Sequence, residues 1–594
     1  MDKRYEILQE YFGHSEFRSL QLEAIDAILN KQDLLMVLPT GGGKSLCYQL
    51  PSLMSSGVSV VISPLLALMH DQVTALKSNG ITAAMISSMQ DFDEIAKIEK
   101  RLKKGTIKIL YIAPERLSNP YFLNLLKSID INFFVIDEAH CVSEWGHEFR
   151  EDYRKLSLLK EHFPHINIAA FTATATSVVQ KDIITNLRLQ NPLLLKGTIF
   201  RKNLTINILN RIKDGRVQLL EFLKQHQNQS GIIYTLSRKS TESVASFLQS
   251  KGIEARCYHA RLSTEQKNQT YKEFIEDKIQ IVVATIAFGM GIDKSNIRFV
   301  VHLNMPKTIE NYYQEIGRAG RDGMEATTLL LHSIQDTIWH KSFIDELPDT
   351  PYKQHALQKI DAMSRFVNYD ECRHKSLAKY FDDTIESCND KCDNCLQTDV
   401  SKTNITQAAQ KLLSAVYKTG QNYGIFYIID ILRASKEQRI LKNSHDRLSV
   451  YGIGMEYTKN QWHSIADKLL EIGALSIGEF KVYKLTPIAI DILKSQKEVF
   501  IRSDRLEVKK AIPKKKVTYF DDYDVEMFDK LRELRNQLAR DNAVPPYVIF
   551  SDKTLKELSQ SKPQTKEQML LVHGIGEIKF QKYGKEFLEL CVNL

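Results

Sequence analysis

Short runs of β-branched and other apolar residues alternate with longer amphipathic stretches between residues 33 and 332. This alternation is typical of parallel α/β domains, in which crossover helices cover both faces of a sheet. Two separate series of apolar runs predict two consecutive lobes with about five strands each, rather than one wide sheet. We expect strands at 34–38, 59–63, 107–113, 133–137 and 168–172 in the first lobe, and at 231–235, 255–259, 279–285, 298–303 and 326–331 in the second.

The pattern beyond residue 347 becomes helical and then mixed. The stretch 502–516 holds seven Lys or Arg against two Asp or Glu without apolar periodicity, which is typical of a flexible basic linker. The end of the chain predicts a compact helical module. We therefore expect lobes at 1–207 and 208–340, a helical cysteine-bearing segment at 341–400, a mixed domain at 401–500, a linker at 501–519 and the terminal module at 520–594.

Charge and cysteine content narrow the class of protein. The 594 residues include 80 Lys or Arg against 72 Asp or Glu, and this net charge of +8 permits nucleic-acid binding without demonstrating it. Four of the eight cysteines fall within 24 residues, which favours a metal site in a reducing compartment over a disulfide scaffold. The most apolar stretch, 58–69, is interrupted by Ser63 and Pro64, so we expect a cytoplasmic protein with no signal peptide and no membrane span.

A glycine-rich loop follows the expected strand 34–38 and precedes a helical stretch, which is the order that a phosphate cradle requires. Its backbone N–H groups can wrap phosphate oxygens, Lys44 adds a cation, and Ser45 can coordinate Mg²⁺. Leu38 stands where the generic motif has a glycine, and a Gly-rich turn with a solvated lysine is the alternative. The candidate nucleotide-binding residues of the loop are Thr40, Gly41, Gly42, Gly43, Lys44 and Ser45.

Two carboxylates, Asp137 and Glu138, end the apolar run 133–137. At the carboxyl edge of a parallel sheet, Asp137 can hold Mg²⁺ through water while Glu138 polarises the attacking water. An apolar strand that ends in acids is common by itself. Together with the loop at Lys44, however, the pair favours an NTPase site.

Arg318 and Arg321 stand three residues apart among three glycines in the second lobe. We expect this spacing to put both guanidinium groups on one helical face, from which they approach a γ-phosphate as arginine fingers. A solvated face or an ion-pair site is the alternative.

The order of these motifs resembles the RecQ family of DNA helicases, in helicase superfamily 2, over nearly the whole chain. The resemblance also rests on Phe12-Gly13 with Phe17-Arg18 and Gln21, and on the segments 63–72, 111–116, 171–176 and 282–293. It implies an α/β fold of two tandem RecA-like lobes, followed by a helical zinc-binding segment, a winged-helix domain and a small all-α HRDC domain. It further implies that Gln21 reads the adenine edge, that Arg18 stacks on the base, and that the nucleotide site includes His14, Gly291, Asp293 and Gln314.

The stretch 141–153 resembles the aromatic-rich loop of this family, in which Trp145 and Phe149 stack on an unpaired base next to Arg150. On the residues alone, Trp145 as a core anchor is the better interpretation. The resemblance implies that ATP closes the cleft between the lobes and hydrolysis releases it, with travel from 3′ to 5′ along the strand. Contacts to DNA phosphates are expected around Ser63, Arg116, Thr172 and Thr285.

Four clustered thiolates suit a tetrahedral Zn²⁺, and a closed thiolate shell is typical of a structural site. His374 as a substitute ligand, or free thiols, are the alternatives. The expected ligands are Cys372, Cys388, Cys392 and Cys395.

The domain 401–500 resembles the winged-helix module of the family, in which some relatives use a hairpin residue to separate the terminal base pair. His445 is the nearest match, although a solvated turn is the better interpretation of its short segment. In the HRDC-like module, Tyr547 is as compatible with packing as with stacking on single-stranded DNA.

The combined prediction is an ATP-dependent DNA helicase that uses ATP, Mg²⁺ and Zn²⁺ and unwinds forked or junction DNA in recombination, repair or replication restart. An RNA helicase is the enzymatic alternative, and a DNA-binding or annealing scaffold with ATP as a conformational ligand is the other. We expect a nucleoid-associated monomer that binds single-stranded and duplex DNA and meets single-stranded-DNA-binding and recombination proteins.

Overall fold

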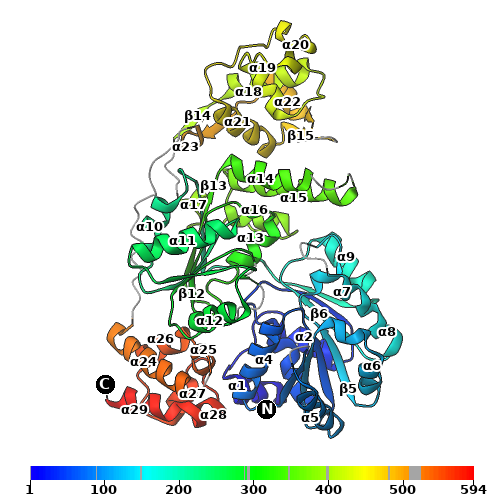
Figure 1. The fold of residues 1–594 in the computed structure, drawn as a ribbon, viewed down its shortest axis with the longest axis vertical. Coiled ribbons are helices and arrows are strands. Elements are labelled where there is room, and N and C mark those ends of the chain that lie inside the picture. Colours follow the sequence, from blue (N-terminus) through cyan, green and yellow to red (C-terminus); the bar gives the residue numbers. More distant parts are fainter. Residues whose placement is uncertain are drawn as a thin grey trace.

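The structure is a computed structural model of the whole chain. It describes residues 2–87, 90–146, 150–286, 288–289, 294–345, 348, 350–396, 401–478, 482–506, 523–542 and 544–593. Two α/β lobes lie side by side, the small mixed domain stands at one end, and the terminal helical module lies against both lobes at the other (Figure 1). No helix among the described residues has both the length and the apolarity to cross a membrane.

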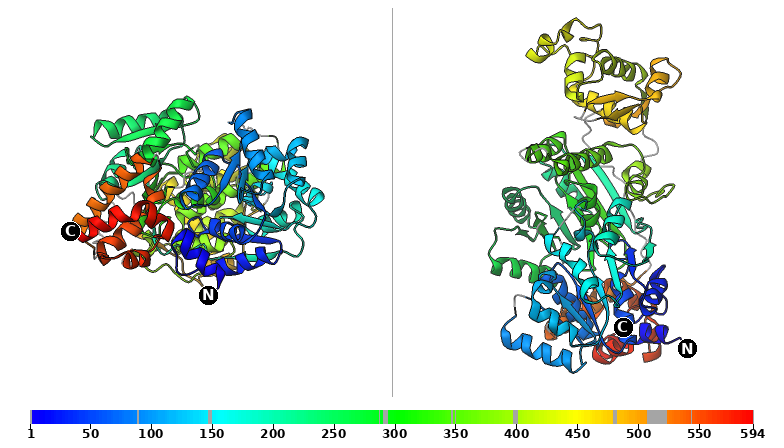
Figure 2. Two further views of the ribbon diagram at one scale, coloured as in Figure 1. Left: turned by 90° about the horizontal axis from the view of Figure 1, so that it is seen from below. Right: turned by 90° about the vertical axis from the view of Figure 1, so that its right-hand side faces the viewer.

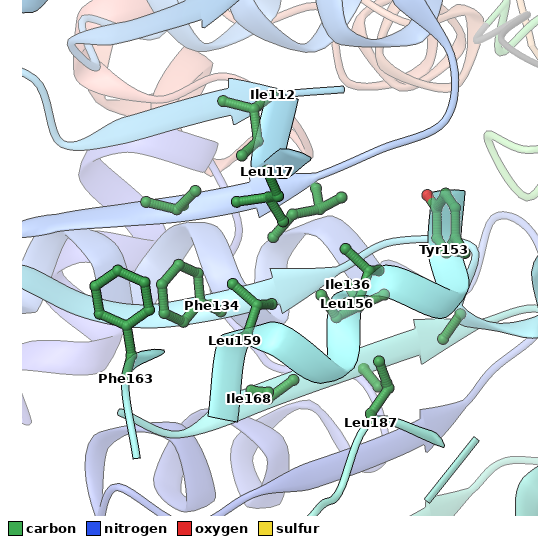
Figure 3. Packing of buried hydrophobic residues seen from close by; sticks show 14 of the residues in the cluster. Ile112, Leu117, Phe134, Ile136, Tyr153, Leu156, Leu159, Phe163, Ile168 and Leu187 are labelled. Carbon is green, nitrogen blue, oxygen red and sulfur yellow. The ribbon is translucent and has the colours of Figure 1, made fainter. Parts of the chain in front are cut away.

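The first lobe is built on a seven-stranded parallel sheet in the order β3-β4-β2-β5-β6-β1-β7. Its strands are β1 Leu34–Val37, β2 Val58–Ile62, β3 Ala83–Ile86, β4 Ile109–Ile112, β5 Ile131–Ile136, β6 Ile168–Thr172 and β7 Leu193–Lys196. The five predicted strands are confirmed, and β3 and β7 were not predicted. Figure 3 shows the core on one face of this sheet, where Phe134, Ile136 and Ile168 pack under short helices.

The second lobe has a six-stranded parallel sheet in the order β10-β11-β9-β12-β13-β8. Its strands are β8 Leu204–Asn210, β9 Ser230–Tyr234, β10 Ala255–Tyr258, β11 Ile281–Ala284, β12 Ile297–His302 and β13 Ala326–His332. The expected boundary between the lobes at 207/208 is wrong, because it cuts the edge strand β8. Burial alternates along β8, so its apolar run is broken in the sequence.

Most of the cysteine-bearing segment continues the core of the second lobe, and Ile344, Ala356, Leu357 and Ile360 form a small cluster of their own. It consists of α14 Ile334–Asp345, α15 Pro351–Asn368, α16 Arg373–Tyr380 and α17 Asp393–Leu396. Met363, Phe366 and Leu377 belong to the same buried cluster as the β8 residues Leu204 and Ile206. The cysteine-bearing segment therefore folds onto the edge of the second sheet that β8 forms.

The mixed domain has a separate core around α18 Thr406–Lys418, α19 Ile425–Leu432, α21 Lys459–Glu471 and α22 Pro487–Leu493. Strands β15 Leu475–Ile477 and β16 Tyr483–Leu485 form an antiparallel hairpin. The expected linker boundary at 501 is wrong, because β17 Phe500–Arg502 pairs with β14 Lys402–Asn404 and leads into α23 Ser503–Leu506. The rest of the predicted basic linker lies outside the described residues.

The terminal module packs α24 Val525–Asp541, α26 Asp552–Ser561, α27 Lys566–Leu571 and α29 Lys585–Asn593 around one apolar cluster. It lies against the N-terminal helix α1 Lys3–Phe12 (Figure 2), where the Gly574 N–H donates to the Gly13 carbonyl over 2.9 Å. Gly13 has φ +66°, and a Cβ there would stand 2.6 Å from the Gly576 nitrogen, so this approach requires glycine.

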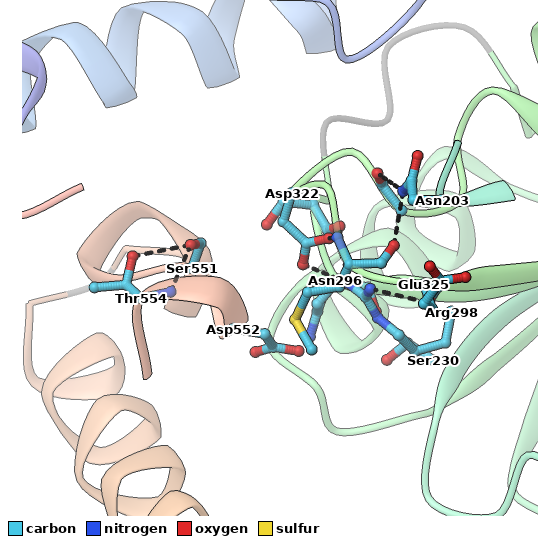
Figure 4. Close-up of polar contacts among 12 residues, drawn as sticks. Asn203, Ser230, Asn296, Arg298, Asp322, Glu325, Ser551, Asp552 and Thr554 are labelled. Carbon is cyan, nitrogen blue, oxygen red and sulfur yellow. Dashed lines mark hydrogen bonds and ion pairs between the residues drawn. The ribbon is translucent and has the colours of Figure 1, made fainter. Parts of the chain in front are cut away.

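The same module also contacts the second lobe. The fully buried Arg535 bonds to Asp552 over 2.8 Å and stands 3.9 Å from Asp277 of the second lobe. Figure 4 shows Asp552 pointing toward the loops that carry Asn296 and Asp322. The terminal module therefore bridges the two lobes.

Candidate nucleotide, DNA and metal sites

The phosphate loop lies where the sequence predicts it, between β1 and α3 Lys44–Met54. Gly41 and Gly43 have φ values of +81° and +84°, a left-handed conformation that turns the loop tightly into the helix. The Lys44 ammonium is partly buried and donates to the Leu38 carbonyl over 2.8 Å. Burial lowers the pKa of Lys44, while Glu138 and Asp137 partly offset that effect. A partly buried cation and open helix N–H groups suit a polyphosphate.

The predicted adenine-recognition residues lie directly against this loop. Gln21 accepts from the Arg18 N–H over 2.8 Å and donates to the Gly43 carbonyl over 3.1 Å. The Arg18 guanidinium donates to the Gly41 carbonyl over 2.8 Å. Gln21 is 1% exposed, so its amide is covered in this arrangement, and its role as the reader of the adenine edge stays a prediction.

His14 is covered by the terminal module. Its ring lies 4.6 Å from that of His573, centroid to centroid. Burial lowers the pKa of His14 to about 3, and His573 and Arg18 add to that effect. His14 is therefore a neutral ring packed between two domains, and its place in the nucleotide site stays a prediction.

Asp137 and Glu138 follow the end of β5, at the same edge as the phosphate loop. Burial raises the pKa of Asp137 to about 7, Glu138 adds to the rise, and Lys44 opposes it. Glu138 has φ +49°, which turns its side chain away from the strand direction. Oxygen donors beside a phosphate loop fit a Mg²⁺ ion, with Ser45 and Asp137 as the residues that would hold it.

His140 was missed in the sequence, although it belongs to the same Asp-Glu-Ala-His motif. It is buried, and its Nδ1 lies 3.3 Å from a Glu138 carboxylate oxygen and 3.0 Å from the Thr172 hydroxyl. It therefore connects the carboxylate pair to the end of β6.

The Thr172 hydroxyl also donates to the Thr174 carbonyl, and both Thr172 and Ser63 have fully buried side chains. Neither hydroxyl is available to DNA in this arrangement, which leaves neighbouring backbone groups for such contacts.

The two arginines do not share a helical face, contrary to the prediction. Helix α13 Ile309–Ile316 ends before them, and both lie in the following turns. Arg321 packs against the phosphate loop, where a Cβ on Gly41 would be 3.4 Å from the Arg321 Cα. Its charge contributes to lowering the pKa of Lys44. Arg318 is buried instead beside the Tyr234 hydroxyl and Gly289 of its own lobe.

The aromatic-rich loop begins directly after the carboxylates. The Tyr153 hydroxyl donates to the Asp137 carbonyl over 3.0 Å, and Arg150 donates to the Pro64 carbonyl over 3.1 Å. Trp145 is 43% exposed, so it is not a core anchor. Phe149 lies outside the described residues, as do Gly291 and Asp293 of the nucleotide prediction.

Three further predicted residues have partly exposed positions. Arg116 donates to the Ser87 carbonyl, Thr285 follows β11 at the carboxyl edge of the second sheet, and Gln314 lies on α13. These places are compatible with contacts to DNA or nucleotide, and for all three residues the binding role stays a prediction.

The four clustered cysteines meet as predicted. Their Sγ atoms all lie within 4.8 Å of one another, and three of them are buried. The chemistry of four thiolates fits Zn²⁺. Arg373 and Asp393, each next to a cysteine, form a buried two-bond ion pair with both distances at 3.0 Å. His374 is not in the cluster, since its Nε2 points at the carbonyls of Leu204 and Lys391, 3.0 and 3.1 Å away.

The last two DNA-binding predictions occupy partly buried positions. His445 lies in the short helical turn η4 His445–Arg447, and its Nδ1 is 2.8 Å from the Tyr427 hydroxyl. It is not part of the β15–β16 hairpin, so it is not a hairpin pin. Tyr547 is partly buried on α25 Pro546–Ile549.

Comparison with known protein families covers almost the entire chain. The matching descriptions are DEAD/DEAH box helicase at 18–182, Helicase conserved C-terminal domain at 215–323, RecQ zinc-binding at 334–396, RQC domain at 399–510 and HRDC domain at 524–591.

Comparison with individual proteins gives the same coverage. The chain is 39% identical to the ATP-dependent DNA helicase RecQ of Pasteurella multocida, over 98% of this chain and 93% of that protein. It is 39% identical to that of Haemophilus influenzae, over 98% and 95%, and 36% identical to that of Bacillus subtilis, over 98% and 97%.

Proposed function

Because the chain belongs to the RecQ family of helicases, we propose that it is a Mg²⁺-dependent ATPase that unwinds forked or junction DNA in the 3′-to-5′ direction. The observation that carries the proposal is the placement of two lobes around one loop. Lys44 and the Asp137–Glu138 pair come from the first lobe, and Arg321 reaches the same loop from the second. Such a site is complete only while the lobes are closed, so hydrolysis and lobe movement are coupled.

The alternatives have less support. The relatives named above are DNA helicases, so an RNA helicase is not retained. A scaffold that only binds ATP has no need for a water-polarising carboxylate together with an arginine at the phosphates. Association with the nucleoid, and with single-stranded-DNA-binding and recombination proteins, stays a prediction.

Unwinding of matched substrates tests the proposal. Forked duplexes of identical sequence are made as DNA and as RNA, with either a 3′ or a 5′ single-stranded tail, and mixed with enzyme, ATP and Mg²⁺. We expect unwinding of the 3′-tailed DNA fork alone. Unwinding from the 5′ tail would contradict the direction, unwinding of RNA would contradict the substrate class, and annealing without ATP hydrolysis would favour the scaffold.

The two arginines are expected to differ in effect. Arg321→Ala should lower kcat about 10³-fold while the KM for ATP changes little, because an arginine finger acts mainly on the transition state. Arg318→Ala is the matched control, since that side chain faces Tyr234, and we expect a kcat loss below about 30-fold. Steady-state ATPase assays with saturating single-stranded DNA measure both. Equal losses, or the reverse order, would assign the finger role differently.

Mg²⁺ dependence should vary with pH through Asp137. Because its pKa is raised to about 7, the carboxyl is mostly protonated at pH 6 and mostly ionised at pH 8, and Mg²⁺ must displace the proton at the lower pH. We expect the Mg²⁺ concentration for half-maximal nucleotide binding to be about tenfold higher at pH 6 than at pH 8. Titration with a fluorescent ATP analogue measures it without hydrolysis.

Glu138→Gln supplies the control for this pH effect. Removing the neighbouring charge should lower the pKa of Asp137, so the transition in Mg²⁺ dependence moves to lower pH. An equal Mg²⁺ requirement at both pH values in the unmodified protein would show that Asp137 does not titrate at the ion.

A further inference from the structure

Two contacts join the exposed aromatic-rich loop of the first lobe to the second lobe. The Lys359 ammonium on α15 donates to the Trp145 carbonyl over 3.0 Å. The His355 ring, one helical turn earlier, meets the Trp145 indole edge to face at 5.2 Å between centroids. In Figure 1, the α14–α15 hairpin reaches out from the second lobe toward α7 Glu151–Arg154 and α9 Ser177–Asn186 of the first.

The same lysine is tied to the helix that leads to the arginines. Lys359 forms a 3.0 Å ion pair with Glu310, and the two side chains are only 11% and 8% exposed. Glu310 lies in the first turn of α13, and Arg318 follows two residues after this helix ends. One partly buried ammonium therefore bonds to both the aromatic-rich loop and the helix that precedes the arginines, using two of its three N–H groups.

The other end of the loop is fixed to the nucleotide site. The Tyr153 hydroxyl holds the Asp137 carbonyl, and the Arg150 N–H donates to the Cys141 carbonyl over 3.0 Å. Trp145 lies between these anchors and contacts α15. Among the described residues, the second-lobe contacts found for the Trp145 indole ring and carbonyl come from His355 and Lys359. These two side chains therefore oppose movement of Trp145.

We propose that His355 and Lys359 are positioning residues that hold the aromatic-rich loop against the second lobe. We call their contacts with Trp145 the latch, and single-stranded DNA displaces the latch when a base stacks on Trp145. The latch rests on the proposed DNA-dependent ATPase function. A base that uses the Trp145 ring competes with His355 for it, and release of the Trp145 carbonyl leaves Lys359 with Glu310 alone. The latch therefore sets how much DNA is needed to switch hydrolysis on.

The loop exchanges between a state held by the latch and a released state, and this equilibrium leads to two linked predictions. Lys359→Met should raise the ATPase rate without DNA about threefold to tenfold, and lower the half-saturating concentration of an oligo-dT strand by a similar factor. The rate at saturating DNA should stay within about twofold, because the released state is the same. His355→Leu should act in the same direction with a smaller effect.

Matched variants separate the latch from general damage. Lys359→Arg keeps a cation for Glu310 and donors for the Trp145 carbonyl, so both values should return close to those of the unmodified protein. Gln358→Met changes an exposed neighbour on the same helix and should have no effect. Because Lys359→Met leaves Glu310 buried without its cation, the double variant Glu310→Gln/Lys359→Met repeats the test without an uncompensated charge.

Fluorescence reports the loop directly. Of the three tryptophans, Trp462 is fully buried, so in a Trp339→Phe background acrylamide quenching reports Trp145. Lys359→Met should increase quenching in the absence of DNA. Unchanged quenching with unchanged rates would overturn the latch, as would a raised DNA-free rate without a lower DNA requirement, or a parallel fall of both rates. Absence of DNA stimulation in the unmodified protein would instead contradict the proposed function.

Discussion

Replacing Lys44 by Ala is expected to reduce ATP hydrolysis and DNA unwinding by at least about 100-fold. Lys44 is the partly buried cation of the phosphate loop, and it also lies near the two carboxylates, whose charges oppose the effect of burial on its pKa. Its removal takes a positive charge from the phosphates. It also removes an interaction that lowers the pKa of Asp137, so this carboxyl holds its proton more tightly.

This variant should keep its fold and its DNA affinity. Loss of the Lys44 side chain removes the cost of desolvating an ammonium but leaves Asp137 and Glu138 without their neighbouring cation, so we expect a modest fall in Tm with the fold retained. Lys97→Ala, at an exposed lysine on α5 Phe92–Lys103, is the matched control and should be fully active. ATPase rates, fork unwinding, fluorescence anisotropy with labelled single-stranded DNA, and thermal unfolding are measured together. Unwinding by Lys44→Ala at a normal rate would contradict the assignment of the nucleotide site.

The central strands could be predicted because their burial is continuous. β2, β4 and β5 lie inside the first sheet; β4 is apolar throughout, and β2 and β5 contain one polar residue each, Ser59 and Asn132. The edge strands β7 and β8 are partly exposed. The sequence of β8 alternates apolar and polar residues, and β7 has only four residues, so neither gives the long apolar run of a central strand. Three features of the sites were predicted for a related reason, because the residues of each stand close together in the sequence. They are the phosphate loop, the carboxylate pair and the cysteine cluster.

The arginine geometry was not predictable from spacing alone. Residues three apart share a face only if the helix continues, and α13 ends at Ile316. The glycines at 317, 320 and 323 are the signal that the helix stops, and two of them have positive φ. Because they lie in turns rather than on a helix, Arg318 and Arg321 face different neighbours. We therefore expect different roles for the two residues, which the sequence alone did not separate.

Contacts between distant parts of the chain had no signal in the sequence. His14 reads as a nucleotide-site residue, and only the fold brings His573 onto its ring. Lys359 reads as one basic residue on an amphipathic helix, and its bond to Trp145 depends on how the second lobe faces the first. Such pairings depend on two surfaces at once, and hydrophobic periodicity describes only one surface at a time.

Replacing Cys392 by Ser is expected to abolish zinc binding and to destabilise the second lobe. Cys392 is fully buried, and the segment that carries it bonds to β8, where the Ile206 N–H donates to the Lys391 carbonyl over 3.0 Å. Three thiolates hold Zn²⁺ far more weakly than four, and binding energy at a structural site is folding energy. We expect zinc content to fall from about one to near zero per chain, and the Tm to fall by about 10 °C or more.

Two controls make this result specific to the metal. Cys257→Ser changes a partly exposed thiol on β10 of the same lobe and should keep zinc and stability. His374→Gln tests the remaining alternative ligand: because its Nε2 already faces two carbonyls, zinc content should stay near one per chain even if packing suffers. Zinc loss in His374→Gln as complete as that in Cys392→Ser would make His374 a ligand. Full zinc content in Cys392→Ser would remove Cys392 from the site and leave the cluster to bind through its other three thiolates.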